Sequence, residues 1–327
     1  MVAILILNWN GWKDTIACLE SLFQIDYKDY MIFLGDNGST DNSREIISKY
    51  CEKKGYNSIW QSLGQINNHA DSHIHLIDLQ VNNGFAKGNN LLVAEAFQYK
   101  PDYFLLLNND TEVEPSFLSK LVEFQCTHSN IKVLTPVIYY FSDKNKIWNA
   151  GGNLFWGLRK YHFPDEYNPG IQENEFIPCT FITGCALFCT PDVLIDKNTI
   201  FTEEFFHGEE DFDFGIRMKK RRIQMGCVTQ SSIFHKVGGT SGNIGHKIGL
   251  TYCYYLNRFI NLRHHLSFIS YYTFILVYFP YVVRLLKLKG LSIKDAICFY
   301  WKVIGESHRL DGVSYGKFIQ CVNKDVI

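Results

Sequence analysis

Four carboxylates lie within one stretch of five residues, and phenylalanines flank the stretch on both sides. The acids are Glu209, Glu210, Asp211 and Asp213, and the phenylalanines are Phe205, Phe206, Phe212 and Phe214. Acids are common in the first turn of a helix because they interact favourably with the helix dipole, and the basic residues 215–222 that follow are compatible with a helix. A helix start explains the charges but not the aromatic flanks. We therefore expect these acids to border a partly dry pocket.

A second cluster of polar side chains ends an apolar run. Residues 103–107 (YFLLL) predict a strand buried on both faces, and Asn108, Asn109 and Asp110 follow it directly. Open α/β sheets bind their ligands at the carboxyl ends of such strands. A carboxylate at this place can hold a hard divalent cation, which in turn can hold phosphates. An ordinary turn between a strand and a helix is the alternative, since Asn and Asp favour turns.

The same arrangement recurs along the first part of the chain. Residues 2–7, 30–34 and 74–79 predict buried strands, and the segments after them contain Asn8 and Asn10, Asp36, and Asn83 to Gly88, respectively. The last of these segments is glycine-containing and opens a helix, a context in which backbone amides approach phosphate, but it does not match G-x-G-x-x-G. The βαβαβαβ order predicts a mostly parallel sheet with right-handed crossovers. Three polar strand ends indicate a polar ligand along one sheet edge.

The pattern changes after residue 130. Residues 132–140, 154–162 and 181–189 predict shorter strands that form an opposite wall, and a short helix begins at Pro191. A strand at 223–228 leads to His235, which precedes Gly238 and Gly239. A single histidine is commonly a structural residue, but this one lies a short distance in sequence after the acidic cluster.

Charge is distributed unevenly along the 327 residues. The net charge is −1, which indicates no affinity for nucleic acid. From Arg258 onward, however, ten Lys and Arg residues stand against four Asp and Glu. The opening MVAILILNWN predicts a strand and lacks the basic region and cleavage site of a signal peptide. We therefore expect a cytoplasmic protein whose ten cysteines are reduced and act as small apolar residues.

Taken in order, these motifs resemble those of family 2 glycosyltransferases with the GT-A fold. The motifs are LNWNGW, GDNGSTD, NNGFAKGNN, LNNDTEVEP, FITGCALF, HGEEDFDFGIRMKKR and FHKVGGTS, across residues 2–291. The set is similar to the branch that includes bacterial rhamnosyl- and galactofuranosyltransferase-like enzymes. The resemblance implies an α/β fold with a Rossmann-like, mostly parallel sheet and helices on both faces. We expect a GT-A domain at 1–245, divided into a nucleotide-binding half (1–130) and an acceptor half (131–245), and a helical region at 246–327.

The resemblance also implies a role for each matching residue. The donor-binding residues would be Asn8, Asn10, Asp36, Asn83, Gly84, Lys87, Gly88, Asn108, Asn109 and Asp110. Asp110 and His235 would bind Mg²⁺ or Mn²⁺, although Asn108 stands where the family often has a charged Asp. Asp211 would be the catalytic base, aided by Glu210, and Thr183, Gly184 and His207 would lie on the acceptor side.

These roles imply a reaction. The enzyme would move a sugar from a UDP- or dTDP-linked donor, such as rhamnose, galactofuranose or a hexosamine, to a hydroxyl of a glycan or lipid-linked acceptor. Transfer would proceed with inversion, during the synthesis of cell-surface polysaccharide. A metal stabilises the leaving diphosphate, and a base in an acidic, aromatic pocket has a raised pKa suited to proton removal.

Two other functions remain open from the sequence. A sugar nucleotidyltransferase also uses an α/β sheet and a metal, but it would carry a basic, glycine-rich motif in place of residues 8–11 (NWNG). A non-catalytic nucleotide-sugar-binding module would have no use for Asp110, Glu210, Asp211 and His235 together.

The tail contains a long uncharged segment. Residues 266–283 (LSFISYYTFILVYFPYVV) lack charge, include Pro280 and precede Arg284, Lys287 and Lys289. Aromatics with a basic flank are typical of a helix at a membrane interface. We expect peripheral contact with the inner face of the membrane, with a buried helix pair or a homodimer interface as the alternatives.

Overall fold

The computed structural model describes residues 1–64, 73–167, 170–196, 198–237 and 248–323. Within these residues an eleven-stranded, mixed sheet is ordered β11-β13-β7-β12-β5-β1-β2-β4-β3, with β6 beside β13 and β8 beside β7. Its strands are β1 (Val2–Asn8), β2 (Tyr30–Asp36), β3 (Trp60–Ser62), β4 (Ile74–Asp78), β5 (Tyr103–Asn108), β6 (Thr111–Val113), β7 (Ile131–Tyr140), β8 (Asp143–Asn149), β11 (Phe176–Cys179), β12 (Ala186–Cys189) and β13 (Gln224–His235).

The nucleotide-binding half of the predicted fold is a parallel sheet. Strand β1 pairs in parallel with both β2 and β5, and β4 extends the sheet beyond β2. The register places Asn8 opposite Asp36 and Leu7 opposite Asn108. Because the strands are parallel, their polar ends meet at one edge, as predicted.

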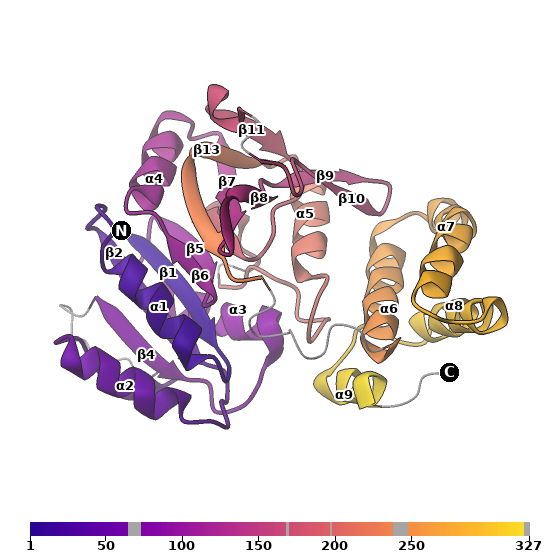
Figure 1. The fold of residues 1–327 in the computed structure, drawn as a ribbon, viewed down its shortest axis with the longest axis horizontal. Coiled ribbons are helices and arrows are strands. Elements are labelled where there is room, and N and C mark those ends of the chain that lie inside the picture. The colour runs from indigo at the N-terminus through magenta and orange to yellow at the C-terminus, as the bar shows by residue number, and fades with distance from the viewer. Residues whose placement is uncertain (65–72, 168–169, 197, 238–247, 324–327) are drawn as a thin grey trace.

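Helices cover both faces of the sheet, which confirms the predicted α/β architecture (Figure 1). Side chains alternate along β1, so that Ile4 and Ile6 join one buried cluster and Ala3 and Leu5 the other. The first cluster includes residues of α1 (Trp12–Leu22), α2 (Ser43–Lys53) and α4 (Phe117–Thr127). The second includes residues of α3 (Gly84–Phe97) and α5 (Glu210–Lys220).

The second half adds strands of both directions, and it differs in detail from the prediction. Strand β12 runs antiparallel to β5 and to β7, whereas β13 runs parallel to β7. Residues 154–162 do not form one strand: β9 (Gly152–Phe155) and β10 (Leu158–Tyr161) make a hairpin that turns at Gly157, whose φ is 79°. The segment at Pro191 is a single 3₁₀ turn, Pro191–Val193.

The remaining helices pack beside α5 at one end of the molecule (Figure 1). They are α6 (Ile248–His265), α7 (Phe268–Leu288), α8 (Ile293–Ser307) and α9 (Tyr315–Asn323). Their shared core also takes in Phe205 and Phe212, so it is continuous with the start of α5. The expected boundary at 245/246 lies outside the described residues, as do Gly238 and Gly239 of the predicted glycine turn.

Candidate functional site

The end of β1 is joined to the end of β2 by a buried polar network. The Asn8 Nδ2 donates to Asp36 Oδ2 (2.9 Å), and the Asp36 carboxylate also accepts from the backbone N–H and the hydroxyl of Ser39 (3.0 and 2.6 Å). Asn10, at φ 52°, accepts from the backbone N–H of Thr40 (2.8 Å). These bonds hold the two strand ends and their loops as one rigid platform.

The start of α3 lies against the same platform. Asn83 is attached to the platform through its backbone, because its N–H donates to Asn37 Oδ1 (2.9 Å). Asn37 follows Asp36 at the end of β2. Gly84 has φ 76°, and a Cβ there would overlap the carbonyl oxygen of Phe206, so only glycine fits. Gly88 packs on Leu7, because a Cβ would lie 2.7 Å from its Cδ2.

Lys87 completes this part of the site. Its side chain is exposed, unlike the buried Gly84 and Gly88 on either side. Among the described residues it forms no ion pair. It is therefore a free cation on the first turn of α3.

The predicted metal ligands lie together, although they are far apart in sequence. Strand β6 pairs with β13, which sets Thr111 opposite His235. His235 Nε2 lies 3.1 Å from Asp110 Oδ1, and both residues are only 7% exposed. Among the described residues, His235 Nδ1 has no hydrogen-bond partner, and Asp110 Oδ1 has none apart from this contact with His235 Nε2.

These two side chains fit a shared divalent cation. A carboxylate oxygen and an imidazole nitrogen are ordinary ligands for Mn²⁺, and buried polar atoms without partners are costly unless a ligand satisfies them. The described residues contain no group of three or more His, Cys, Asp or Glu side chains placed to hold a metal. Asp110 and His235 could supply only two ligands to such a cation, and phosphate and water oxygens would have to supply the others.

The two asparagines before Asp110 point to different neighbours. Asn109 Nδ2 donates to the Thr15 hydroxyl (2.9 Å), and Thr15 donates to Asn8 Oδ1 (2.8 Å). Asn109 thus ties β5 to β1 inside the platform. Asn108 receives support through its backbone, whose N–H donates to the carbonyl of Cys185 (2.8 Å).

Two of the four clustered carboxylates are neutralised by partners within the fold. Glu209 accepts two hydrogen bonds from Arg258 of α6, both at 2.7 Å, and each side chain is 2% exposed. Asp213 accepts from Arg217 (2.7 Å) and lies 2.6 Å from His265 Nε2. Their roles are structural, since both link α5 to neighbouring segments.

The other two carboxylates are the ones that match the predicted catalytic pair. Burial, followed by the charge of Asp211, raises the pKa of Glu210 to about 8, and Glu210 Oε2 has no hydrogen-bond partner. Burial also raises the pKa of Asp211, while the nearby Arg159 guanidinium opposes that rise. The Arg159 Nη1 to Asp211 Oδ1 distance is 3.5 Å. The site thus holds one carboxyl that is mostly protonated at neutral pH beside one that a cation favours as the anion.

Backbone hydrogen bonds and close packing connect the predicted acceptor-side residues with the predicted donor side. Cys185, whose carbonyl meets Asn108, follows Thr183 and Gly184, and a Cβ on Gly184 would lie 3.0 Å from the ring of Phe85 in α3. The Phe85 N–H donates to the carbonyl of Phe206 (3.3 Å), which immediately precedes His207. His207 is exposed, and its ring lies 5.7 Å from that of Phe318 in α9.

Three contributors to this site were not predicted from the sequence. Arg159 reaches Asp211 from the β9–β10 hairpin, and no local motif marks it. Arg258 lies in the second half of α6 and is the one charged residue in the otherwise uncharged stretch 248–262, which is a signal for a buried pair. Val313 forms a parallel bridge with Phe205 and accepts from the Phe206 N–H (2.8 Å), so the C-terminal region holds the segment before the acids.

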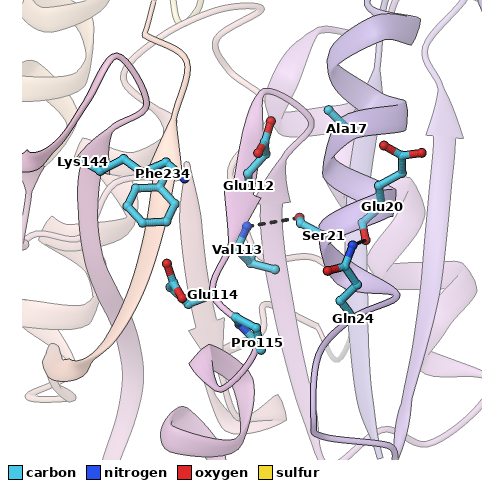
Figure 2. A pocket seen from close by; sticks show the side chains of 10 residues that line it. All are labelled: Ala17, Glu20, Ser21, Gln24, Glu112, Val113, Glu114, Pro115, Lys144 and Phe234. Carbon is cyan, nitrogen blue, oxygen red and sulfur yellow. Dashed lines mark hydrogen bonds between the residues drawn. The ribbon is translucent and has the colours of Figure 1, made fainter.

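A separate pocket opens between α1 and β6 (Figure 2). Its lining combines three glutamates with one lysine: Ala17, Glu20, Ser21, Gln24, Glu112, Val113, Glu114, Pro115, Lys144 and Phe234. None of the residues predicted for donor, acceptor or metal binding lines it. We therefore assign the candidate site to the sheet edge.

The fold defined by this sheet edge is that of GT-A glycosyltransferases. The structure is similar to that of S. aureus TarS 1–349 in complex with UDP-GlcNAc, with a TM-score of 0.56 and 14% sequence identity. The match covers 99% of this chain and 82% of the TarS chain. The structure is also similar to GalNAc-T7 with UDP, GalNAc and Mn²⁺ (TM-score 0.59, 14% identity, 98% of this chain, 56% of that one). A third match is the mannosyltransferase PcManGT from Pyrobaculum calidifontis with GDP-Man and Mn²⁺ (TM-score 0.54, 9% identity, 94% and 75%).

Sequence comparison identifies the family. Residues 3–191 match "Glycosyl transferase family 2", and residues 103–305 match "Glycosyl transferase family group 2". The chain therefore belongs to glycosyl transferase family 2.

Two curated proteins are related to this chain at low sequence identity. Glycosyltransferase GlyG of Streptococcus pneumoniae serotype 4 is 20% identical over 65% of this chain and 62% of its own length. The teichoic acid poly(glycerol phosphate) polymerase of Staphylococcus epidermidis is 27% identical over 34% of this chain. This chain spans only 13% of that polymerase.

Proposed function

We propose that the protein is an inverting, metal-dependent glycosyltransferase that uses a nucleotide diphosphate sugar. The donor would be UDP- or dTDP-linked, with rhamnose, galactofuranose or a hexosamine as the sugar, and the acceptor a hydroxyl of a glycan or a lipid-linked glycan. The observation that carries this proposal is the pairing of two half-sites: Asp110 with His235, and Glu210 with Asp211. Among the residues that the structure describes, Glu210 Oε2 and His235 Nδ1 have no hydrogen-bond partner, and Arg159 approaches Asp211 only at 3.5 Å.

The comparisons support the substrate class. Three structural neighbours were solved with UDP-GlcNAc, UDP with GalNAc, or GDP-Man, and two of them with Mn²⁺. The teichoic acid polymerase and GlyG are bacterial, which supports a role in cell-surface polymer synthesis. The rhamnosyl- or galactofuranosyltransferase branch is part of the proposal and rests on the order of the sequence motifs.

On the donor side, the rigid platform orients the nucleotide. Asn8, Asn10, Asp36 and Asn109 fix the loops that line it, and the exposed Lys87 offers a cation to the diphosphate on the first turn of α3, where the helix dipole also favours negative charge. Asp110 and His235 would hold Mg²⁺ or Mn²⁺, which neutralises charge that develops on the leaving diphosphate.

On the acceptor side, Asp211 removes the hydroxyl proton. The hydroxyl oxygen then bonds to the anomeric carbon as the bond from that carbon to the diphosphate oxygen breaks, so the configuration inverts. Burial raises the pKa of Asp211, and Arg159 opposes that rise and so favours the ionised form that a base must have, whereas Glu210 carries a proton and positions the acceptor by a hydrogen bond. Gly184, Thr183 and His207 border the acceptor.

Measuring sugar transfer by variants of Asp211 and Glu210 tests this assignment. Asp211→Asn should lower product formation about a hundredfold or more because it removes the proton acceptor, while donor affinity stays within about twofold. Glu210→Gln should lose less, since an amide still donates a hydrogen bond. The assay measures release of UDP or dTDP from a panel of nucleotide sugars with detergent-extracted bacterial glycolipids as acceptors, and Asp192→Asn, which alters an exposed carboxylate, serves as control. Turnover near that of the wild type in Asp211→Asn would overturn the assignment of the base.

A further inference from the structure

One face of α7 is apolar and uncovered. Its large side chains are between 40% and 78% exposed: Ile269, Tyr272, Leu276, Val277, Tyr281 and Leu288. Neighbouring α8 adds Ile293 and Trp301, which are 55% and 47% exposed. Contiguous exposure of this kind on a soluble fold indicates a contact surface. Helices α7 and α8 also lie at the end of the molecule opposite α2 and β4 (Figure 1).

The opposite face of α7 belongs to the protein core. Tyr271, Phe274, Ile275, Tyr278, Val282 and Leu286 are buried among α6 and α8, and the hydroxyl of Tyr300 in α8 donates to the carbonyl of Ile275 (2.6 Å). The helix has 21 residues and is long and apolar enough to cross a membrane. Crossing would nevertheless require it to leave this core, so the exposed face can meet lipid only with the helix lying along the surface.

The exposed face ends in cations. Arg284, Lys287 and Lys289 occupy the last turns of α7 and the residue after it, and all three side chains are exposed. Helix α7 contains no acidic residue, and Arg284 and Lys287 form no ion pair with any residue that the structure describes. Exposed Ile, Leu and Tyr side chains followed by free cations match the chemistry of a bilayer interface with anionic head groups.

A second copy of the chain would suit this face less well. In a two-fold dimer the same patch meets itself, so the cations of each copy need acids on the other copy's patch. Helix α7 offers none, and the two acids of α8 are already engaged within the fold, because Asp295 accepts from the hydroxyl of Ser292 and Glu306 pairs with Lys317. Phosphate groups of lipid satisfy both the apolar and the basic part at once.

We propose that α7, with the exposed edge of α8, is a membrane-docking face that lies in the plane of an anionic bilayer. This inference deepens the proposed function, because a lipid-linked acceptor would be presented at the same surface. It can be tested without any transfer, since vesicle binding needs neither donor nor acceptor.

The experiment is cosedimentation of the full chain with vesicles of phosphatidylcholine alone or with phosphatidylglycerol, at low and high salt. Wild type should bind the anionic vesicles and be released at least in part by salt. Leu276→Asp with Val277→Asp should abolish binding, and Arg284→Gln with Lys287→Gln should weaken it about tenfold or more at low salt. Two control variants make comparable changes on the exposed surface of another part of the fold. The single variant Ile59→Asp is the control for the apolar substitutions, and the double variant Lys53→Gln, Lys54→Gln is the control for the basic ones; both should bind like wild type.

Each alternative has its own result. Wild type that ignores anionic vesicles at low salt, or face variants that bind as well as wild type, would overturn the proposal. A wild-type dimer in light scattering that the Leu276→Asp, Val277→Asp variant converts to a monomer, without vesicle binding, would assign the face to a second copy. Binding that is independent of lipid charge and resists salt would assign it to a spanning helix. Asp211→Asn should bind vesicles like wild type, so failure of the catalytic proposal is recognised separately.

Discussion

The presence or absence of close cationic partners divides the carboxylates at the start of α5 into two kinds. Glu209 and Asp213 each have cationic partners within 3 Å, and these pairs join α5 to α6 and to its own next turn. Glu210 has no such partner, and Asp211 meets Arg159 only at 3.5 Å. Side chains of the same chemistry and nearly the same position in sequence therefore differ in protonation and in task.

The raised pKa of Glu210 predicts a dependence of stability on pH. In the unfolded chain this carboxyl ionises near its ordinary value of 4.5, whereas in the folded protein it keeps its proton up to about 8. Folding is therefore favoured by this group below pH 4.5, and that contribution is lost as the pH rises through 8. Glu210→Gln removes it.

The measurement is urea unfolding of wild type and Glu210→Gln at pH 5 and pH 9. From pH 5 to pH 9, the free energy of unfolding of the variant should rise relative to that of wild type, by up to about a few kcal/mol. An equal stability difference at both pH values would show that Glu210 ionises normally in the fold. Asp192→Asn, at a position that is 64% exposed, should show no such change.

The resemblance to the family predicted part of this site. Asp110 and His235 match the family's metal-binding positions and were therefore expected to meet, and His235 Nε2 lies 3.1 Å from Asp110 Oδ1. Arg159 was missed because its side chain reaches Asp211 only through the folding of a hairpin, which no nearby residue in the sequence announces.

At the scale of elements, apolar runs located the buried strands and left their order unresolved. Strands β1, β2, β4 and β5 lie where four largely apolar runs predicted them. Strands β3, β6 and β8 carry too few apolar residues for a clear pattern, and residues 154–162 divide at Gly157, whose positive φ favours glycine. The position of β12 between β5 and β7 follows from long-range pairing that periodicity does not contain.

The tie between α5 and α6 yields a prediction at this scale. Arg258→Met leaves the buried Glu209 carboxylate without a cation, which should lower the free energy of unfolding by about 3–5 kcal/mol. Adding Glu209→Gln removes the stranded charge, so the double variant should recover a large part of that loss. Urea unfolding at pH 7 measures both.

The control for that experiment is an exposed carboxylate, after the end of α8, that pairs with another arginine of α6. Arg263 and Asp311 lie 2.9 Å apart, but Asp311 is 93% exposed, so Asp311→Asn should change stability by less than about 1 kcal/mol. If Arg258→Met costs no more than this control, the buried pair does not hold α6 to α5.

At the scale of the whole molecule, ligand binding should appear as increased stability. A nucleotide sugar that binds the folded form at 100 times its Kd raises the free energy of unfolding by about 2.7 kcal/mol. If Asp110 and His235 hold the metal, Mn²⁺ and the correct donor should stabilise the protein more together than the sum of their separate effects.

Thermal unfolding with UDP-, dTDP- and GDP-sugars, each with and without Mn²⁺, measures this coupling. His235→Ala should lose it, whereas Glu112→Gln, on β6 but outside the predicted ligand pair, should retain it. Coupling that survives in both His235→Ala and Asp110→Asn would reject the shared metal site.

The contact between Gly84 and Phe206 has a consequence for how donor preference can change during evolution of the family. Phe206 is held by the hydrogen bond from its N–H to the carbonyl of Val313 (2.8 Å) and by the ring of Phe318, 5.3 Å away, and its own carbonyl accepts from the first turn of α3. Helix α9 and the segment before it therefore brace the loop proposed to grip the donor. Two descendants with identical first halves but different residues in this region should not select nucleotide sugars equally well, so donor preference can diverge through substitutions more than two hundred positions away from the loop it changes.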